Sequence, residues 1–555
     1  MIKIYVSMMT KLFFISILLF SNFAQSQITT WSGTWNNGIP DNTKDAVFTT
    51  NYTSAGNMNA KSILVSSGAQ VTISSNHDFT VQNNIDVSGV GSKLVFENNA
   101  SLIQINSAAT NTGNISYRRN ATPMRQYEYT YWASPVSGQT LGAFSPLTNS
   151  NRFYTFNGNP TVNNYVVENT ANAMLSSIGY VIMAPSNYTG TSQIYNAEFI
   201  GIPNNGNYTT PVFAFDTTIK NYNLIGNPYP SAISTASFFA GNSNLGTLYF
   251  WTHNTAISSN VFSSTDYAIR TQTVGTAAVS GGVAPGNYIA TGQGFFASSG
   301  TNGFINFNNS MRVASFNTQF FRNNQPSQAI PLNYYFWLNM TNTDGVFKQM
   351  ALGYQENATN GYDFGIDASA AAGTYINFYS LISTNPFAIQ GRAYPWNIND
   401  VIPLGYSSTL AGNFDIAIDH NDTFFDGKDI FLKDLVTQTF HNLKNGPYNF
   451  TTTVGTGFNS RFEIHYINGS LSNNDFYLNP NSVLVSQNGY EIEVTSSLQK
   501  IKSIQVYNLL GQVIFEQKSN NLNKIVISNM IKQNQALIIK TELENGQIVS
   551  KKLIF

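Results

Sequence analysis

Short runs of alternating apolar and polar residues follow one another along most of the chain. Between residues 59 and 106 they recur about every eight residues, as SILVSS, AQVTIS, DFTVQN, IDVSG, SKLVFEN and SLIQIN, each bounded by Gly, Asn or Ser. Alternation with a period of two is typical of half-buried β-strands. Closely spaced short strands predict a β-helix-like segment over residues 27–120, and a Greek-key sandwich is the alternative.

Two tryptophans precede these strands in TTWSGTWNNGIP. We expect Trp31 and Trp35 to cover one end of the stack, because a terminal strand otherwise presents unpaired backbone groups. The stretch as a whole resembles the small β-helix segments that open many exported surface proteins of gliding bacteria. That resemblance implies the same local fold here.

The next region, residues 121–316, contains one succession of motifs twice. YWASPVSGQTLGAFSP is followed by NRFYTFN, GYVIMAP and AEFIGIPNNG, and NLIGNPYPSAISTASFF is followed by TLYFWTHN, GQGFFAS and INFNNSMR. A repeated order of motifs indicates two copies of one β unit. We expect Pro135 and Pro228 in equivalent turns. Tyr154 and Tyr249 then lie in equivalent strands. Since solenoids need three or more repeats, we predict two β modules packed together.

Alternation with polar turns about every ten residues continues over residues 317–470, in runs such as NYYFWLNMTN, NFDIAIDH and RFEIHYI. This spacing is typical of a β-sandwich. A last set of strands, over residues 475–555, contains two Asn-Gly pairs that mark hairpin turns. The sequence therefore predicts an all-β, multidomain chain with a short β-helix-like segment, duplicated β modules, a β-sandwich and a small C-terminal β-sandwich.

Composition narrows the functional classes. Charged residues make up 10% of the chain, and 27 Lys and Arg against 28 Asp and Glu give a net charge of −1. An average chain carries about 25% charged residues. Without a basic field to gather phosphates, we expect no nucleic-acid partner. The 555 residues contain no cysteine, which excludes disulfides, thiolate metal sites and cysteine nucleophiles.

Residues 1–26 have the pattern of a cleaved signal peptide. Lys3 and Lys11 precede the apolar run LFFISILLF, and the small residues Ala24 and Ser26 follow it. This arrangement directs export. A membrane anchor is the alternative, but the run is short against about 30 Å of hydrocarbon. We expect cleavage after Ser26 and a mature chain without a transmembrane segment.

The C-terminal region carries three motifs in order: VYNLLGQ at Val506–Gln512, LENG at Leu543–Gly546 and KKLIF at Lys551–Phe555. Together they resemble the type A C-terminal sorting domain of the type IX secretion system of Bacteroidota. The resemblance covers about the last eighty residues, the size of a small β domain. The sorting-motif residues that it implies are Val506, Tyr507, Asn508, Leu509, Leu510, Gly511, Gln512, Lys551 and Lys552.

The same resemblance implies a route. The signal peptide would deliver the chain to the periplasm, and the type IX secretion machinery, the expected partner, would move it across the outer membrane. Removal of the sorting domain on arrival is expected. The expected location is therefore the cell surface or the medium, and the sorting domain is an address rather than a catalyst.

Catalytic motifs find no supporting context in the sequence. GQGFFA, Gly292–Ala297, fits a dinucleotide fingerprint, but SSGTNG follows where a phosphate-binding helix should begin. DFG, Asp363–Gly365, stands without the other kinase elements. We therefore expect no catalytic residue and no organic cofactor. The dispersed histidines, expected in strands and loops, are His77, His253, His420, His441 and His465.

One acidic concentration, DHNDTFFDGKDIFLKD, spans Asp419–Asp434. Its spacing does not match an EF-hand, whose Gly and terminal Glu stand elsewhere. A hairpin loop with Asp-Gly as its turn explains the segment without a metal and is the preferred interpretation. A Ca²⁺ site is the alternative. Its oxygen ligands would be Asp419, Asn421, Asp422, Asp426 and Asp429.

Aromatic residues make up 14% of the chain and stand in short strands beside Asn, Thr and His. Flat rings next to amides are how sugar-stacking platforms are built. Trp132 and Trp251, at related positions of the duplication, are the candidate glycan-binding residues. Large rings also fill β cores, which is the stronger general tendency. Burial of both rings is therefore the alternative.

The signatures YWASPV, GNPYPSAI, FWTHNT and GQGFF resemble those of a group of large exported flavobacterial proteins. This resemblance implies a fold but no activity. Low charge, modular β architecture and missing catalytic motifs favour a surface or released binding protein, adhesin-like, that contacts glycans or envelope components. A secreted polysaccharide-degrading enzyme, a hydrolase or lyase using scattered carboxylates, is the alternative.

Overall fold

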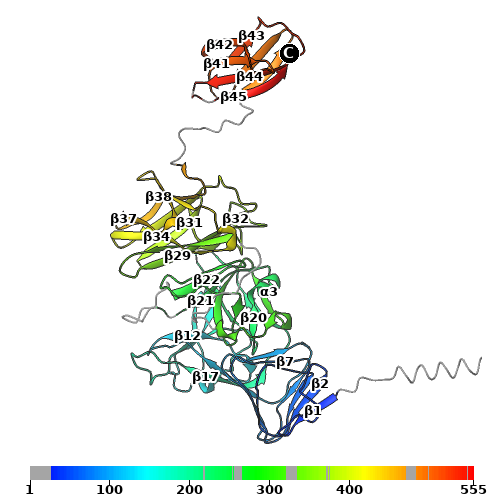
Figure 1. Cartoon of the computed structure of the whole chain (residues 1–555). Coiled ribbons are helices and arrows are strands. Elements are labelled where there is room, and N and C mark those ends of the chain that lie inside the picture. Colours follow the sequence, from blue (N-terminus) through cyan, green and yellow to red (C-terminus); the bar gives the residue numbers. More distant parts are fainter. Residues whose placement is uncertain are drawn as a thin grey trace, which may run out of the picture. The chain divides into compact units, whose positions relative to one another are not determined.

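Strands form nearly all of the regular structure in the computed structural model (Figure 1). Two compact units divide the chain, Met1–Ile467 and Asn468–Phe555, and each is described by itself. The predicted all-β class is confirmed. The expected signal peptide and His253 lie outside the described residues. The structure describes residues 27–216, 219–252, 254, 266–319, 334–370, 373, 375–469, 483–497, 499–544, 546 and 548–555.

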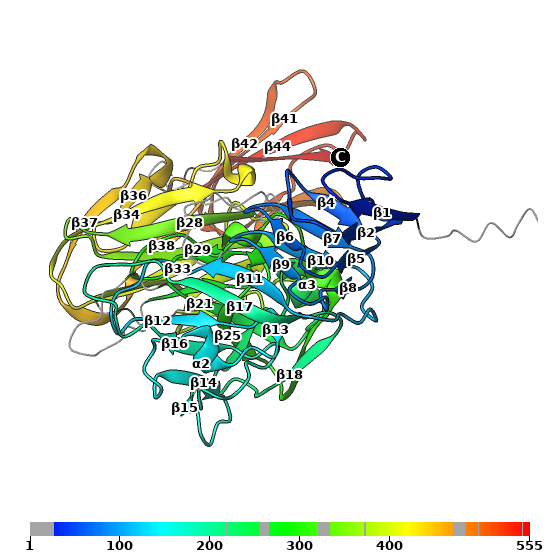
Figure 2. The same cartoon turned by 90° about the horizontal axis from the view of Figure 1, so that it is seen from below.

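The N-terminal segment is a β-solenoid of about four turns with three parallel sheets, whose strands group together in Figure 2. The β-helix-like prediction is therefore confirmed. The first sheet contains β1 (Gln27–Trp31), β2 (Lys44–Phe48), β5 (Ser62–Val65) and β8 (Ile85–Asp86). The second contains β4 (Met58–Ala60), β7 (Asp78–Val81) and β10 (Ser101–Gln104). The third begins with β3 (Tyr52–Thr53), β6 (Gln70–Ile73), β9 (Lys93–Phe96) and β11 (Ile115–Asn120).

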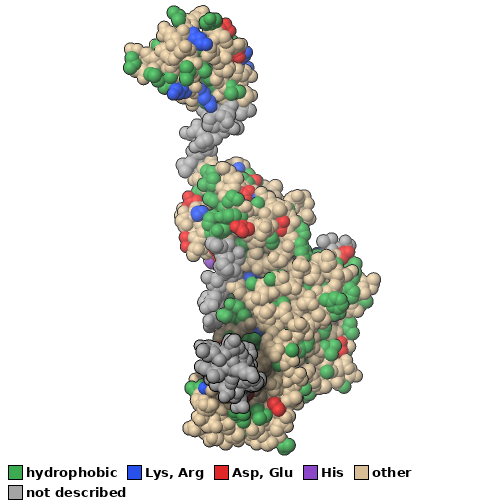
Figure 3. Space-filling model, turned by 90° about the vertical axis from the view of Figure 1, so that its right-hand side faces the viewer, with side chains coloured by type: hydrophobic (Ala, Val, Ile, Leu, Met, Phe, Trp, Pro, Cys, Tyr) green, Lys and Arg blue, Asp and Glu red, His purple; other side chains and the backbone are tan. Residues whose placement is uncertain are grey.

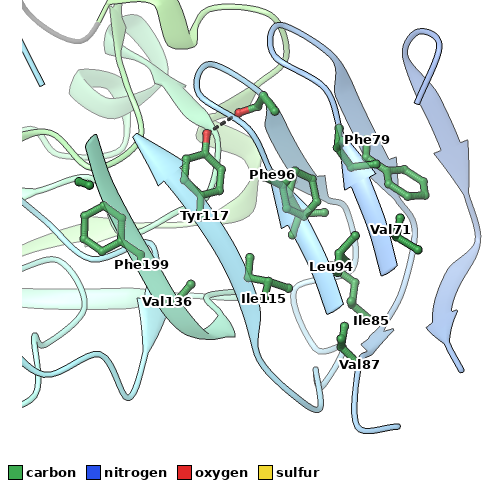
Figure 4. Close-up of a cluster of buried hydrophobic side chains, with 14 of the residues drawn as sticks. Val71, Phe79, Ile85, Val87, Leu94, Phe96, Ile115, Tyr117, Val136 and Phe199 are labelled. Carbon is green, nitrogen blue, oxygen red and sulfur yellow. Dashed lines mark hydrogen bonds between the residues drawn. The ribbon is translucent and has the colours of Figure 1, made fainter. Parts of the chain in front are cut away.

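Apolar side chains of successive turns stack inside the solenoid. Parallel pairing places Ile63 beside Ile85 and Val71 beside Leu94, so equivalent positions stand 22 or 23 residues apart. All four side chains are at most 1% exposed. Figure 4 shows this column of inward-pointing side chains continuing past Tyr117. Full burial of such a side chain contributes about 1.5–3 kcal/mol, so packing stabilises a segment that has no disulfides.

Aromatic rings close the first turn of the solenoid. The Trp31 ring lies 4.9 Å from that of Tyr52, and the Trp35 ring lies 5.3 Å from that of Phe48. Both tryptophans thus cover an end of the stack, as expected. At the other end β11 pairs antiparallel with β17 (Asn196–Pro203), so the third sheet continues into the next region.

The duplication is visible in the order of the strands, which confirms the prediction of two related β modules. The first module has the sheet order β12 (Tyr129–Trp132), β16 (Tyr180–Met183), β14 (Phe153–Asn157) and β15 (Asn164–Val167). The second has β19 (Asn223–Gly226), β25 (Gly294–Ser299), β21 (Leu245–Trp251) and β22 (Tyr267–Arg270), followed by β23 (Gly275–Thr276).

The two modules exchange equivalent contacts. Ala133 N donates a hydrogen bond to Gly292 O over 2.9 Å, and Gly226 N donates to Ser177 O over 3.1 Å. Each bond joins a first strand to the segment that precedes the last strand of the opposite module. An approximate two-fold axis therefore relates the two modules.

The predicted equivalences within the duplication hold. Tyr154 and Tyr249 occupy the same place in β14 and β21, each paired with the last strand of its module. Pro135 and Pro228 follow the first strands in the same kind of turn. In both turns the side-chain oxygen before the proline accepts a hydrogen bond from the N–H after it.

Helices are few and short. α2 (Leu141–Phe144) and α3 (Thr235–Ala240) follow the first strands of the two modules, and Thr140 and Ser234 cap their N-termini through side-chain oxygens. In the described part of the chain, no helix has the length and apolar character needed to cross a bilayer. The single-turn 3₁₀ helices are η2 (Asn309–Met311), η3 (Asn317–Gln319), η4 (Thr423–Phe425) and η5 (Leu443–Asn445).

Short strands connect the modules with their surroundings. β13 (Val136–Ser137) pairs with β17, and β18 (Tyr208–Val212) pairs with β26 (Gly303–Phe307). β20 (Ala232–Ser234) lies between β24 (Tyr288–Ile289) and β27 (Arg312–Val313). The two module sheets meet in an apolar layer centred on the buried side chains Tyr131, Val181, Leu224 and Phe296.

An eleven-stranded sheet completes the first unit. Leu338 and Leu404, from opposite halves of this sheet, belong to one buried core, so the sheet folds over itself as a sandwich. The order begins with β36 (Thr439–Asn442), β35 (Phe431–Asp434), β38 (Gly455–His465), β33 (Ile402–Ser408) and β31 (Ile376–Ile382). It continues with β32 (Asn385–Ala393), β29 (Phe347–Gln355), β28 (Tyr334–Thr341), β34 (Gly412–Asn421) and β37 (Tyr448–Thr452), and β30 (Ala368–Ser369) pairs with β32.

The second unit is a small sandwich of two antiparallel sheets. Val494, Val506 and the terminal Phe555 are at most 1% exposed and share its core. One sheet contains β39 (Val483–Asn488), β40 (Glu491–Ser496) and β43 (Lys524–Ile527). The other contains β42 (Val513–Leu522), β41 (Ile501–Tyr507), β44 (Ala536–Leu543) and β45 (Ile548–Ile554).

Candidate functional site

A groove of about 670 Å³ lies between the β14–β15 hairpin and the strands that begin the second module. We call it the intermodule groove. Its wall combines rings with amides and one carboxylate, the kind of lining expected of a small-molecule site. The lining residues that matter most below are Phe156, Asn157, Glu168, Asn172, Phe213 and Asn223.

Glu168 is fixed in the groove by two neutral donors. Thr155 Oγ1 donates a hydrogen bond to Glu168 Oε1 over 2.8 Å, and Asn172 Nδ2 donates to Oε2 over 2.8 Å. Asn172 is itself held, because its carbonyl accepts from Leu141 N, at the start of α2, over 3.0 Å. Each carboxylate oxygen can accept a second hydrogen bond. Glu168 therefore offers a ligand two positioned acceptor atoms.

Further polar groups line the same wall. The Tyr180 hydroxyl accepts from Leu175 N over 2.8 Å, and burial raises the Tyr180 pKa to about 12, so this hydroxyl keeps its proton. Asn157 Oδ1 accepts from Asn159 N over 3.0 Å, which leaves the amide Nδ2 as a donor. Asn223 binds the backbone of the neighbouring segment and is part of the scaffold.

The second module carries the counterpart of this arrangement in a closed form. Tyr154 pairs with Val167, and Tyr249 pairs with Ile269, so the next residues along, Glu168 and Arg270, are equivalent. Arg270 Nη2 donates to Asn287 Oδ1 over 2.9 Å, whereas its equivalent in the first module, Glu168, accepts from Asn172. Arg270 is 4% exposed, however, whereas Glu168 is only partly buried. One copy of the site is open and the other is filled.

A family model described as Domain of unknown function (DUF8693) matches residues 24–466. The chain belongs to the DUF8693 family. The DUF8693 region contains the solenoid, both modules and the eleven-stranded sandwich, so the intermodule groove lies within it. A second model, Domain of unknown function (DUF8694), matches residues 471–555, which include the second unit's sandwich. No curated protein matches the chain.

The tryptophans expected as a glycan platform lie inside the DUF8693 region and are buried to different extents. Trp132 is 1% exposed and packs between the modules and the solenoid, so its ring has no face for a polymer. Trp251 is partly buried; its ring stacks on Tyr131 at 5.9 Å, and its Nε1 donates to Tyr129 O over 3.1 Å. The alternative, burial in a β core, applies to Trp132 because both faces of the first module's sheet are covered.

The acidic segment Asp419–Asp434 of the DUF8693 region spreads its side chains over separate partners. Asp419 accepts from Asn339 Nδ2 over 2.8 Å, and its hydrogen bond with His420 lowers its pKa. Asp426 accepts from Asn421 and Asp429 from Asn442. Among the described residues, no three His, Cys, Asp or Glu side chains gather as a metal site would require.

Two buried ionisable groups of the DUF8693 region were not singled out from the sequence. Asp367 is 2% exposed; its carboxylate accepts from Gly391 N and Asp363 N over 2.8 and 2.7 Å, and burial raises its pKa to about 7. Arg392 donates twice to Asp400, over 2.5 and 2.6 Å. Both groups lie within the sandwich and hold loops in place.

Most of the residues predicted as a sorting motif lie at the end of β41 and in the tight turn that follows it in the second unit. Val506 is buried, while Asn508 Oδ1 accepts from both Leu510 N and Gln512 N over 3.0 Å. This arrangement leaves Leu509 71% and Leu510 85% exposed. Further members of the motif are Tyr507, which ends β41, Gly511, which has a positive φ of 77°, and Lys551 and Lys552 in β45.

Proposed function

We propose that this chain is an exported binding protein whose intermodule groove holds a neutral glycan. The observation that carries the proposal is the open groove, in which Glu168 is held by Thr155 and Asn172 and whose wall includes Phe213. Sugar hydroxyls donate to such a carboxylate, and the C–H face of a sugar packs on a ring. Glycans or neighbouring envelope components are the partners in this reading.

The surface supports an uncharged ligand. Charged residues are 10% of the chain, and on the face drawn in Figure 3 they are scattered among uncharged side chains. A polyanion would need a basic field for capture. Long-range attraction therefore contributes little, and recognition rests on hydrogen bonds and ring contacts in the groove.

Binding is better supported than hydrolysis. Glycosidases use two carboxyl groups about 5–9.5 Å apart. Among the described lining residues of the intermodule groove, Glu168 is the one carboxylate. Product analysis on any glycan that binds separates a binding protein from the polysaccharide-degrading alternative, because an enzyme releases shorter chains.

A glycan array, followed by calorimetry on the best ligand, tests the groove. Glu168→Ala should weaken binding by about 10–100-fold, since hydrogen bonds to a charged group contribute about 1.5–3 kcal/mol. Glu198→Ala, an exposed glutamate on β17, is the matched control and should bind normally. Equal binding by both variants would place the ligand elsewhere.

We further propose that the second unit is the sorting domain of a type IX secretion substrate, with the secretion machinery as its partner. The exposed Leu509 and Leu510, presented by the Asn508 turn, support this assignment, because exposed apolar side chains that lie together can mark a protein interaction site. The protein would then reach the cell surface or the medium.

Deletion of residues 475–555 tests the sorting assignment and should leave the protein in the periplasm. Leu510→Ala should reduce export without unfolding the unit, while Ile531→Ala, at a side chain 79% exposed in the same unit, should be exported normally. Immunoblots of medium, surface and periplasm measure the outcome. Normal surface levels after the deletion would refute the address.

A further inference from the structure

The edge strand β15 is open in the first module although its counterpart in the second module is covered. Among the described strands, β15 pairs with β14 alone, and Tyr165, Val166 and Val167 are 42%, 42% and 57% exposed. Its counterpart β22 pairs with β21 on one side and β23 on the other. Ile269 of β22, the equivalent of Val167, is 3% exposed. Figure 2 shows β15 at the periphery beside β14.

The hydrogen-bond pattern shows which backbone groups face the open edge. Glu168 N donates to Phe153 O over 2.8 Å, so these residues form a hydrogen-bonded pair between β14 and β15. Backbone groups alternate in direction along a strand. The N–H and C=O groups of Tyr165 and Val167 therefore point to the open side. Tyr165 N is held locally by the Asn164 side chain over 2.8 Å, which leaves Val167 as the edge's most accessible donor.

We propose that β15 pairs antiparallel with β15 of a second copy of the chain, about a two-fold axis at Val166. In this register Tyr165 of each copy lies opposite Val167 of the other, so the axis generates two such pairs. Both residues have their backbone groups directed across the new interface. An aromatic ring opposite a β-branched side chain is a favourable cross-strand pair. The sequence of the strand is thus complementary to itself.

The flanking residues agree with the same register. Glu168 comes to lie opposite Asn164 of the other copy, so a carboxylate meets an amide rather than a like charge. Val166 meets its own copy on the groove side of the sheet, where it is paired with Thr155 within each chain. Exposed edges of this kind otherwise invite uncontrolled association. Pairing in one defined register removes that hazard.

The dimer has a consequence for ligand binding, which rests on the function proposed above. Thr155, Val166 and Glu168 line each groove, so pairing at Val166 brings the two grooves side by side across the axis. A long glycan could occupy both, and linked sites raise apparent affinity through effective concentration. Dimer formation itself needs no ligand and is measured without one.

Cysteine cross-linking tests the register directly, because the chain has no cysteine of its own. Val166→Cys places two thiols opposite each other at the axis, within reach of a disulfide. Val162→Cys, in the same hairpin with a side chain 50% exposed, is the matched control. Under mild oxidant, Val166→Cys should form covalent dimer about tenfold faster than the control.

Sedimentation of the purified protein gives the second measurement. The unmodified chain should sediment as a dimer whose fraction increases with concentration, and Val167→Pro, which removes a donor from the open edge, should sediment as a monomer. Tryptophan fluorescence of the Pro variant checks that the unit stays folded. A monomeric unmodified chain, or equal cross-linking of the two cysteine variants, would overturn the proposal. If the unmodified chain forms the dimer but binds no glycan, only the function proposed for the groove is refuted.

Discussion

Replacing Trp132 by Ala measures how far the packing of the first module against the solenoid and β17 stabilises the first unit. The Trp132 ring is 1% exposed and lies 5.2 Å from the Phe144 ring and 6.0 Å from that of Phe199, both in edge-on contact. Its removal leaves a cavity that the surrounding sheets cannot fully close. Truncation of a buried large ring costs about 3–5 kcal/mol, and that is the expected loss in the free energy of unfolding.

Urea unfolding followed by tryptophan fluorescence is the assay. All six tryptophans, from Trp31 to Trp396, lie in the first unit, so the signal reports that unit alone. With an m value of about 3–4 kcal/mol/M, the midpoint should move by about 1 M. Trp251→Ala, at a partly buried ring, is the reference variant. It should cost less, about 1–2 kcal/mol, because less apolar surface returns to water.

The outcome separates the two interpretations of the aromatic pair. A Trp132→Ala variant within about 1 kcal/mol of the unmodified protein would contradict full burial, since surface substitutions usually stay near that range. A larger loss for Trp251 than for Trp132 would also refute the reasoning. Neither substitution should change the binding of a glycan by Glu168, which lies outside the contacts of both rings.

Three further predictions concern charged groups. Because burial raises the pKa of Asp367 to about 7, the folded chain keeps a proton that the unfolded chain loses near pH 3.9, so the free energy of unfolding should fall as pH rises from about 4 to 7. Urea titrations across that range should show a flatter slope for Asp367→Asn. Asp400→Asn should lower the free energy of unfolding by about 3–5 kcal/mol, because the side chain of Arg392, 8% exposed, loses its counter-charge. Glu97→Gln, at an exposed ion pair, should lower it by about 0–1 kcal/mol. A chelator should leave the melting temperature nearly unchanged if Asp419–Asp434 is a turn, and a large rise with added Ca²⁺ would contradict that interpretation.

Local patterns were sufficient to predict much of the fold. The spacing of inward side chains such as Ile63 and Ile85 is repeated in the sequence, so the stacked strands could be recognised. The two modules could be matched because their motifs occur in the same order. Burial of Trp132 was one of two interpretations that the sequence left open, because adjacent strand positions face opposite sides and only the fold shows that both sides are covered. Coverage of a second face depends on distant parts of the chain.

The candidate site was missed for a similar reason. Glu168 stands alone in VVENTANA, and its neighbours in space include Phe213 and Asn223, more than forty residues later. Distance along the chain hides such a site from any motif search. A comparison of the two copies would have given one signal, since Glu168 in one copy is replaced by Arg270 in the other. A change of charge at an equivalent position indicates that the two modules differ in function there.

The later turns of the solenoid bond to the second module and the segment after it, at Leu102 and Asp78, so a further turn is best added at the capped end. The first turn of the solenoid is closed by Trp31 and Trp35, and its last strand merges with β17, and neither end depends on the number of turns between them. One more turn, made by repeating residues 62–84, would add about 4.8 Å, the spacing of adjacent strands. Such a variant should fold and keep the groove intact, which fluorescence and glycan binding would check. The number of turns therefore sets the distance between the terminal cap, formed by Trp31 and Trp35, and the groove.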